Sequence, residues 1–350
     1  MRTILIVSLV LLVVSCPCSL AVPVSDTLPH VVIVATGGTI AGTGSSSGEL
    51  LNYTPGTISI SDLMATVPGL NTSASLEGEQ FSNIASDQMT PALWLNLTLR
   101  VNELLADPDV DGVVITHGTD TLEETAYFLN LGVHSDKPVV ITGAMRPATA
   151  ISADGPLNLL NAVRLAGDPA AKGRGVLICL NNEINGARDT TKTSTEMVET
   201  FRSPDFGLLG YMQDEKPAFY RNSTRRHTAA SEFILAHGTR LPRVDIVYGY
   251  PGMDTTALDA FASGGSEGIV LAALGNGGYP ESIGDALVNL SARGIPVVVS
   301  SRTGTGIVAP GDTSLISADT LNPQKARILL MLALTKTHDT AEIGKMFGEY

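Results

Sequence analysis

The stretch Val31-Val-Ile-Val-Ala-Thr-Gly-Gly-Thr-Ile-Ala-Gly42 decides the fold. Its apolar beginning predicts a buried strand, and the paired glycines end this strand in a tight turn. Open α/β sheets bind their ligands beyond the carboxyl ends of parallel strands, where the chain leaves open space. We therefore expect a ligand site at this turn, next to the hydroxyl groups of Thr36 and Thr39.

The same arrangement occurs again at Val113-Val-Ile-Thr-His-Gly-Thr-Asp120, where an apolar strand runs into a Gly-Thr turn and a helix follows from Leu122. Strand and helix patterns alternate along the rest of the chain, which predicts an α/β fold of two doubly wound domains with mostly parallel sheets. We expect further strands at residues 138–142, 175–180, 244–250, 268–274 and 296–301, and helices at residues 58–67, 91–106, 155–166, 255–262, 281–293 and 323–336. Residues 43–56 are predicted to form a long loop, and residues 82–88 a polar turn.

A chain of 350 residues favours two domains over one. Residues 214–242 are polar and end at Pro242, so we place the linker in this stretch. The predicted organisation is a signal peptide at 1–21, a larger N-terminal catalytic α/β domain at 22–218, a linker at 219–242 and a smaller C-terminal α/β domain at 243–350.

The first residues predict export. Arg2 precedes the apolar run Ile4–Val14, and the small residues Ser19 and Ala21 precede an expected cut, which is the pattern of a secretory signal peptide. The apolar run is too short to span a bilayer. Two alternatives are an uncleaved N-terminal anchor and a lipoprotein that carries its lipid on Cys16. The sequence therefore predicts a periplasmic or secreted protein.

The composition excludes several kinds of ligand. The formal charge of −13 repels nucleic acid and anionic lipid, so we expect neither as a partner. The six histidines lack the spacing of metal ligands, and we expect no metal site. The glycines match neither the dinucleotide nor the P-loop pattern, so no cofactor is expected. Signal cleavage leaves only Cys179, which its apolar neighbours predict to be a core residue that forms no intrachain disulfide.

Five residues could carry acid–base or nucleophilic chemistry. Thr39 and Thr119 occupy equivalent positions just past a strand, but a threonine hydroxyl needs a nearby base to act as a nucleophile. Tyr53 in the long loop and Lys192 are candidate bases, and Asp120 could orient that lysine or bind a substrate ammonium. Taken one at a time, these residues have ordinary alternatives, because Thr is common in turns and Lys is usually a solvated surface charge.

Longer motifs resemble one known family. Residues 35–42 and 112–122 closely resemble the two signatures of the bacterial-type L-asparaginase family. Further stretches similar to that family are residues 137–147, 152–156, 191–193 and 321–327. The resemblance covers the chain from about His30 to Tyr350, and the predicted export indicates the periplasmic or secreted type II group.

The resemblance implies hydrolysis of L-asparagine to L-aspartate and ammonia through a threonine acyl-enzyme. Carried over by position, Thr39 is the primary nucleophile and Tyr53 its partner from the loop. Thr119, Lys192 and Asp120 form a second, triad-like group, in which Asp120 binds the α-ammonium of the substrate.

Three further residues receive substrate-binding roles by the same resemblance. Ser86 holds the α-carboxylate, Asp87 lies near the ammonium, and Ala144 presents its main-chain carbonyl to the leaving amide. Relatives often carry Gln or Glu at the position of Asp87, which leaves the ratio of glutaminase to asparaginase activity open. A broad-specificity glutaminase-asparaginase is the first alternative. An exported solute-binding protein without catalysis is the alternative from another class.

The family also implies a homotetramer whose active sites are completed by a neighbouring subunit. Relatives supply a carboxylate from the loop that corresponds to residues 304–314, where this sequence has no Glu and only Asp312 could substitute. A second contact from the neighbour falls near residues 251–254, which read Pro-Gly-Met-Asp here. The resemblance therefore predicts a shared site whose far wall differs from the family pattern.

Overall fold

The first strand, β1 (His30–Gly37), lies inside an eight-stranded sheet with the order β12-β11-β8-β7-β6-β5-β1-β4. The computed structural model describes residues 27–309 and 314–350. The predicted signal peptide, Cys16 and Asp312 lie outside these residues. The other strands of this sheet are β4 (Ser75–Ile84), β5 (Gly112–Thr116), β6 (Val139–Thr142), β7 (Val176–Leu180), β8 (Glu183–Gly186), β11 (Gly210–Gln213) and β12 (Lys216–Phe219).

Pairing within the sheet is parallel from β4 through β7 and antiparallel from β7 to β12. The core strands β1, β5, β6 and β7 are buried and alternate their side chains between two hydrophobic clusters. One cluster includes α1 (Ile60–Thr66), α2 (Leu70–Ser73) and α5 (Gly155–Gly167), and the other includes α3 (Pro91–Ala106) and α4 (Leu122–Gly132). Helices thus cover both faces, as a doubly wound sheet requires.

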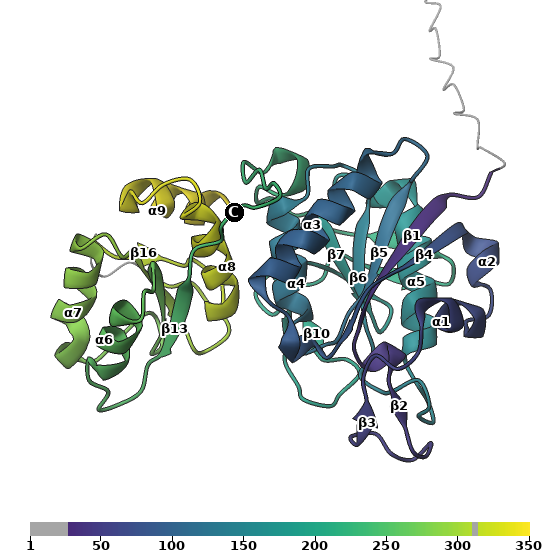
Figure 1. Cartoon of the computed structure of the whole chain (residues 1–350), viewed down its shortest axis with the longest axis horizontal. Coiled ribbons are helices and arrows are strands. Elements are labelled where there is room, and N and C mark those ends of the chain that lie inside the picture. The colour runs from purple at the N-terminus through teal and green to yellow at the C-terminus, as the bar shows by residue number, and fades with distance from the viewer. Residues whose placement is uncertain (1–26, 310–313) are drawn as a thin grey trace, which may run out of the picture.

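A second, smaller sheet forms the other lobe in Figure 1. Its parallel strands have the order β13 (Val244–Tyr248), β14 (Gly268–Ala273), β15 (Val297–Ser301) and β16 (Ile316–Ser317). The helices α6 (Thr256–Ser263) and α7 (Glu281–Ala292) belong to the hydrophobic cluster on one face, and α8 (Pro323–Ala333) and α9 (Thr340–Glu349) to that on the other. The predicted fold class is confirmed.

The two lobes share hydrophobic core. Helix α8 packs against α4, and one buried cluster joins Trp94 and Phe128 of the larger lobe to α8, α9 and Tyr350. The chain ends beside the junction between the lobes (Figure 1). The smaller lobe is therefore close enough to contact the edge of the site on the larger sheet.

Two local predictions were wrong. Residues 82–88 were expected to be only a turn, but β4 extends to Ile84 and a 3-10 turn, η2 (Ser86–Gln88), follows. Strand β4 lies at the sheet edge and has no fully buried residue, so it lacks the apolar run that marks a buried strand. Residues 43–56 contain the hairpin strands β2 (Thr43–Gly44) and β3 (Tyr53–Thr54) instead of loop alone. Helix α1 is capped by Ser59, whose side chain accepts from the Asp62 N–H.

Other expected elements agree to within a few residues. Helix α3 has the predicted bounds, whereas α8 ends at Ala333 and β13 at Tyr248, earlier than expected. Cys179 is buried in β7, where burial raises the pKa of its thiol to about 12. It is thus a core residue, as its apolar neighbours predicted.

Candidate active site

Two glycine turns meet at the carboxyl ends of β1 and β5, which are parallel neighbours. A Cβ atom added to Gly38 would lie 2.4 Å from both the Cα and the N of Gly118, so the two turns are in direct contact. Gly38 also has a φ of 82° and a ψ of −170°, a backbone conformation that is almost confined to glycine. The glycine therefore allows the turns that precede Thr39 and Thr119 to lie side by side.

Thr39 is buried and begins a short 3-10 turn, η1 (Thr39–Ala41). Its Oγ1 lies 2.6 Å from the phenolic oxygen of Tyr53, which belongs to β3 of the hairpin. The ring of Tyr53 packs on Gly42, where an added Cβ would lie only 2.9 Å from a ring carbon. The hairpin thus brings Tyr53 over Thr39, as expected for the pair.

Lys192 joins the second group. It lies in β9 (Thr191–Lys192), which pairs with β10 (Phe201–Arg202), and its Nζ donates to Thr119 Oγ1 at 3.0 Å and to Asp120 Oδ1 at 2.6 Å. Thr119 is buried, whereas the Asp120 side chain is 71% exposed. An open cavity of about 300 Å³ is lined by Asp120, Lys192 and residues 193–195. The carboxylate is therefore accessible to a ligand.

The remaining predicted site residues lie around the same turns. Ser86 is buried directly against Gly118, since an added Cβ there would lie 2.7 Å from Ser86 Oγ. Asp87 follows it and is exposed. Ala144 is buried just after β6, next to Gly143, where an added Cβ would lie 3.4 Å from the methyl carbon of Thr119. Four strand ends thus supply the site, and all eight predicted residues are placed at this edge of the sheet.

His117 supports the glycine turn that follows β5. Its Nδ1 lies 2.7 Å from the Gly118 carbonyl oxygen, and its Nε2 lies 2.9 Å from Thr125 Oγ1, which also accepts from Trp94 Nε1. Because a carbonyl only accepts, Nδ1 carries the proton and Nε2 accepts from Thr125. Complete burial lowers the pKa of His117 to about 4, so the ring is neutral at pH 7. This contact fixes the peptide that precedes Thr119.

Sequence reasoning missed Glu123. It lies in the first turn of α4, and its side chain is buried. One carboxylate oxygen accepts from the Lys192 main-chain N–H at 3.3 Å, and the other accepts from Gln324 Nε2 at 2.6 Å. A glutamate three residues after Asp120 gave no signal that it supports Lys192, because acids are common at helix N-termini.

Among the described residues, no cluster of His, Cys, Asp and Glu could hold a metal ion. No helix in the described part of the chain is long and apolar enough to cross a membrane. Residues 251–254, expected to reach a neighbouring subunit, precede α6 in the smaller lobe. The contacts described above join hydroxyl, amine and carboxylate groups.

Two family models match the chain: asparaginase, N-terminal, over residues 30–225, and glutaminase/asparaginase C-terminal domain over residues 243–347. The chain belongs to the asparaginase family. L-asparaginase 2 of Bacillus subtilis is 47% identical to it, over 92% of this chain and 87% of that protein. L-asparaginase 2 of Escherichia coli is 46% identical, over 92% of this chain and 94% of that protein.

Other members of the family are similar to the same extent. The glutaminase-asparaginase of Pseudomonas fluorescens is 46% identical, over 92% of this chain and 91% of that protein. Among solved structures, that of a probable cytoplasmic L-asparaginase from Campylobacter jejuni covers 92% of this chain and all of its own, with 47% identity and a TM-score of 0.90. The resemblance of the motifs to the family, and the α/β architecture, are both confirmed.

Proposed function

We propose that this protein hydrolyses L-asparagine to L-aspartate and ammonia through a threonine acyl-enzyme. The observation that carries the proposal is the contact between the two turns, which brings a Thr39–Tyr53 pair next to a Thr119–Lys192–Asp120 group. Membership of the asparaginase family and the L-asparaginase relatives support the same reaction.

In the acylation step, Thr39 Oγ1 attacks the carboxamide carbon while its proton passes along the 2.6 Å hydrogen bond to Tyr53. The phenol releases its own proton in exchange, and this proton replaces the one that Lys192 supplies to the leaving nitrogen. Main-chain N–H groups of the two turns stabilise the oxyanion that forms. The departing nitrogen takes a proton, supplied through Thr119 Oγ1 and Lys192 Nζ, and leaves as ammonia. Water then attacks the ester, which releases L-aspartate and restores the Thr39 hydroxyl.

The zwitterionic end of the substrate explains the remaining polar residues. The exposed Asp120 carboxylate binds the α-ammonium, with Asp87 nearby, and Ser86 binds the α-carboxylate. The main-chain carbonyl of Ala144 accepts from the leaving amide. Charge-assisted hydrogen bonds of this kind orient a small substrate and hold its side-chain amide at Thr39.

Replacement of the nucleophile tests the proposal. Thr39→Ala should abolish ammonia release from L-asparagine while calorimetry still detects binding of L-asparagine. Ammonia release at the wild-type rate by the variant would refute the assignment of Thr39. Wild-type protein that binds L-asparagine but releases no ammonia would instead be a solute-binding protein.

L-glutamine is a second candidate substrate, favoured by the glutaminase-asparaginase relatives and by the exposed Asp87. The kcat/KM values for L-asparagine and L-glutamine should be compared on one preparation. A large preference for L-asparagine supports the narrow activity, whereas equal values support the broad one.

Export and assembly complete the proposal. A signal peptide at residues 1–21 would place the enzyme in the periplasm or outside the cell, and a Haemophilus influenzae relative is described as periplasmic, whereas the Campylobacter jejuni structure is described as cytoplasmic. The mature chain then has domains at 22–218 and 243–350 joined by a linker, and forms a homotetramer with shared sites. Intact mass of the exported protein and light scattering test both points.

A further inference from the structure

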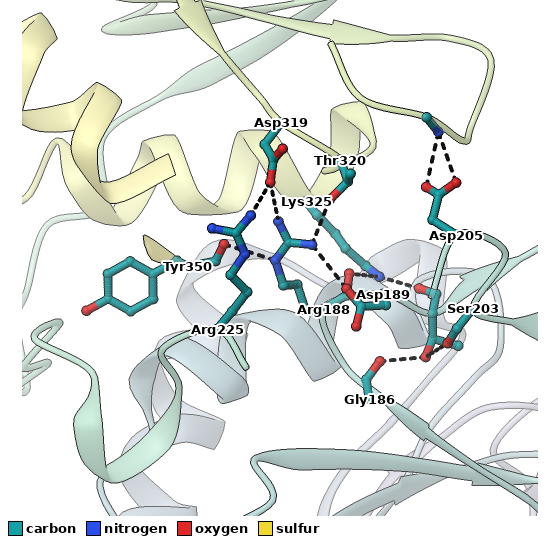
Figure 2. Close-up of polar contacts among 12 residues, drawn as sticks. Gly186, Arg188, Asp189, Ser203, Asp205, Arg225, Asp319, Thr320, Lys325 and Tyr350 are labelled. Carbon is teal, nitrogen blue, oxygen red and sulfur yellow. Dashed lines mark hydrogen bonds and ion pairs between the residues drawn. The ribbon is translucent and has the colours of Figure 1, made fainter. Parts of the chain in front are cut away.

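The segment that leads into Lys192 is held by the smaller lobe. It runs from Gly186, at the end of β8, to Lys192 in β9. Arg188 donates to the Tyr350 main-chain oxygen at 2.9 Å and to Thr320 Oγ1 at 2.8 Å, and it forms an ion pair with Asp319 at 3.4 Å. Figure 2 shows these residues between the C-terminal helices and the segment. The smaller lobe therefore helps to hold residues 186–192 in place.

Lys325 makes the most buried of these contacts. It lies in the first turn of α8, is 1% exposed, and its Nζ donates to the main-chain carbonyl of Arg188 at 2.9 Å and to that of Thr190. Burial lowers the pKa of its amine to about 8, although Glu123 and Asp189 partly oppose the shift. Thr190 precedes β9 directly, so the amine anchors the chain two residues before the side chain that donates to Thr119.

The same turn of α8 makes two further contacts. Asn322 caps the helix by accepting from the Lys325 N–H, and its own amide donates to Thr191 Oγ1 at 3.5 Å. Gln324 acts on Lys192 through Glu123. Its amide donates to the Glu123 carboxylate, and this carboxylate accepts a hydrogen bond from the Lys192 main-chain N–H. Three neighbouring side chains of the smaller lobe thus contact the segment that leads into β9, β9 itself, or the carboxylate that holds the Lys192 N–H.

A buried amine rarely stabilises a fold as well as an apolar side chain of similar volume would. Lys325 instead satisfies two carbonyls at one defined place, as a positioning contact requires. We propose that Lys325 is a positioning residue of the asparaginase reaction, which clamps residues 188–190 and so sets the Lys192 amine against Thr119. This inference rests on the role in proton transfer proposed above for Lys192.

The test combines Lys325→Met and Lys192→Met in a double-mutant cycle. Lys325→Met keeps the length of the side chain and removes the donors, and it should lower kcat for L-asparagine about 10- to 100-fold, because a small misplacement of a catalytic group is costly. KM should change less than kcat, since Ser86 and the main chain of the turns stay in place. In the Lys192→Met background, Lys325→Met should have almost no further effect on kcat, because the group that it positions is gone.

Arg327→Met is the matched control. Arg327 lies on the same helix and at the same junction, where it donates to the Val244 carbonyl at 2.9 Å and faces the Trp94 ring. Among the described residues, no hydrogen bond or ion pair joins it to residues 186–192. Its replacement should lower Tm without the fall in kcat. Should Lys325→Met not fold, Gln324→Leu tests the same turn, because its half-buried side chain acts through Glu123.

The outcomes separate this inference from the proposed function. If Lys192→Met keeps the wild-type kcat, the role of Lys192 is wrong and the positioning role falls with it. If Lys192→Met loses activity but Lys325→Met keeps its kcat, or lowers it by the same factor in both backgrounds, only the positioning role is wrong. An equal fall in kcat for Arg327→Met would also overturn it, since the effect would then be a general loosening of the junction.

Discussion

In the proposed reaction, single hydroxyl groups carry the chemistry of this site. Tyr53 and Thr39 are joined by a short hydrogen bond, yet they come from a hairpin and a glycine turn that pack together only in the folded chain. His117 has a purely supporting place: it is neutral, buried and bound to the peptide before Thr119. Variants of Tyr53 and His117 therefore distinguish a group that is proposed to react from a group that supports the turn.

Tyr53→Phe removes the phenolic oxygen and keeps the ring that packs on Gly42. We expect kcat for L-asparagine to fall about 100-fold or more, the contribution typical of a positioned proton acceptor, with Tm nearly unchanged. Tyr220→Phe, at a tyrosine that is 73% exposed, is the control and should leave kcat unchanged. Steady-state ammonia release measures both. A wild-type kcat in Tyr53→Phe would contradict the proton-transfer role.

His117 should make the fold less stable in acid. Its pKa of about 4 lies below the ordinary value of 6.5, so the unfolded chain binds more protons between these values. The contribution of His117 to the free energy of unfolding is fully present above pH 6.5 and is lost as the pH falls towards 4. For a group whose pKa is shifted this far, the loss is about 3 kcal/mol. His227, whose pKa is also lowered by burial, likewise loses its contribution in acid. Burial raises the pKa of Glu124 to about 7, so Glu124 has the opposite effect and stabilises the fold as the pH falls.

The difference between wild type and His117→Gln isolates this contribution, because the other groups titrate in both proteins. Urea unfolding at pH 7 and at pH 4.5 gives the two free energies. The loss between these pH values should be smaller in the variant. Equal losses would show that His117 does not titrate as its burial requires.

Whole elements were easiest to predict where burial produced a continuous signal. Strands β1 and β5 read as apolar runs because helices cover both of their faces. Strand β4 and the β2–β3 hairpin could not be read in this way, because edge and surface strands are held by main-chain hydrogen bonds and need few apolar side chains. The roles of Glu123 and Lys325 could not be predicted for a related reason. Their partners are distant in sequence and are mostly main-chain groups, which residue types do not reveal.

The contact between the two glycine turns gives a prediction at this scale. Gly38→Ala should be destabilised well beyond the roughly 1–2 kcal/mol that a left-handed conformation costs, because its Cβ meets the Gly118 backbone at 2.4 Å. The matched control is Gly252→Ala, which has a φ of 80° but no atom within 4 Å of the added Cβ. Chemical denaturation compares the two variants. Similar losses would mean that the turns do not press against each other.

At the scale of the whole molecule, the two lobes are joined by a shared core rather than by a surface contact. Trp94 stacks on Phe128 with 5.4 Å between ring centroids, and both belong to the cluster that contains α8, Phe233 and Tyr350. The polar contacts of Arg188 and Lys325 lie along the same junction (Figure 2). The smaller lobe is thus part of the support of the site.

The shared core predicts one cooperative unfolding transition. Trp94 is the only tryptophan of the chain, so its fluorescence reports on the junction, while far-ultraviolet circular dichroism reports on the helices of both lobes. The two signals should change at the same urea concentration. A fluorescence change that clearly precedes the loss of helix would show that the lobes separate before they unfold.

The buried thiol of Cys179 has a practical consequence. With a pKa of about 12 and no exposure, it is inert towards maleimide reagents while the protein is folded. In a chain that begins at residue 22, a cysteine introduced at the exposed Asn52, beside Tyr53 in the hairpin, would be the single point of attachment for a dye. Energy transfer from Trp94 to that dye could then follow the hairpin in real time as substrate enters.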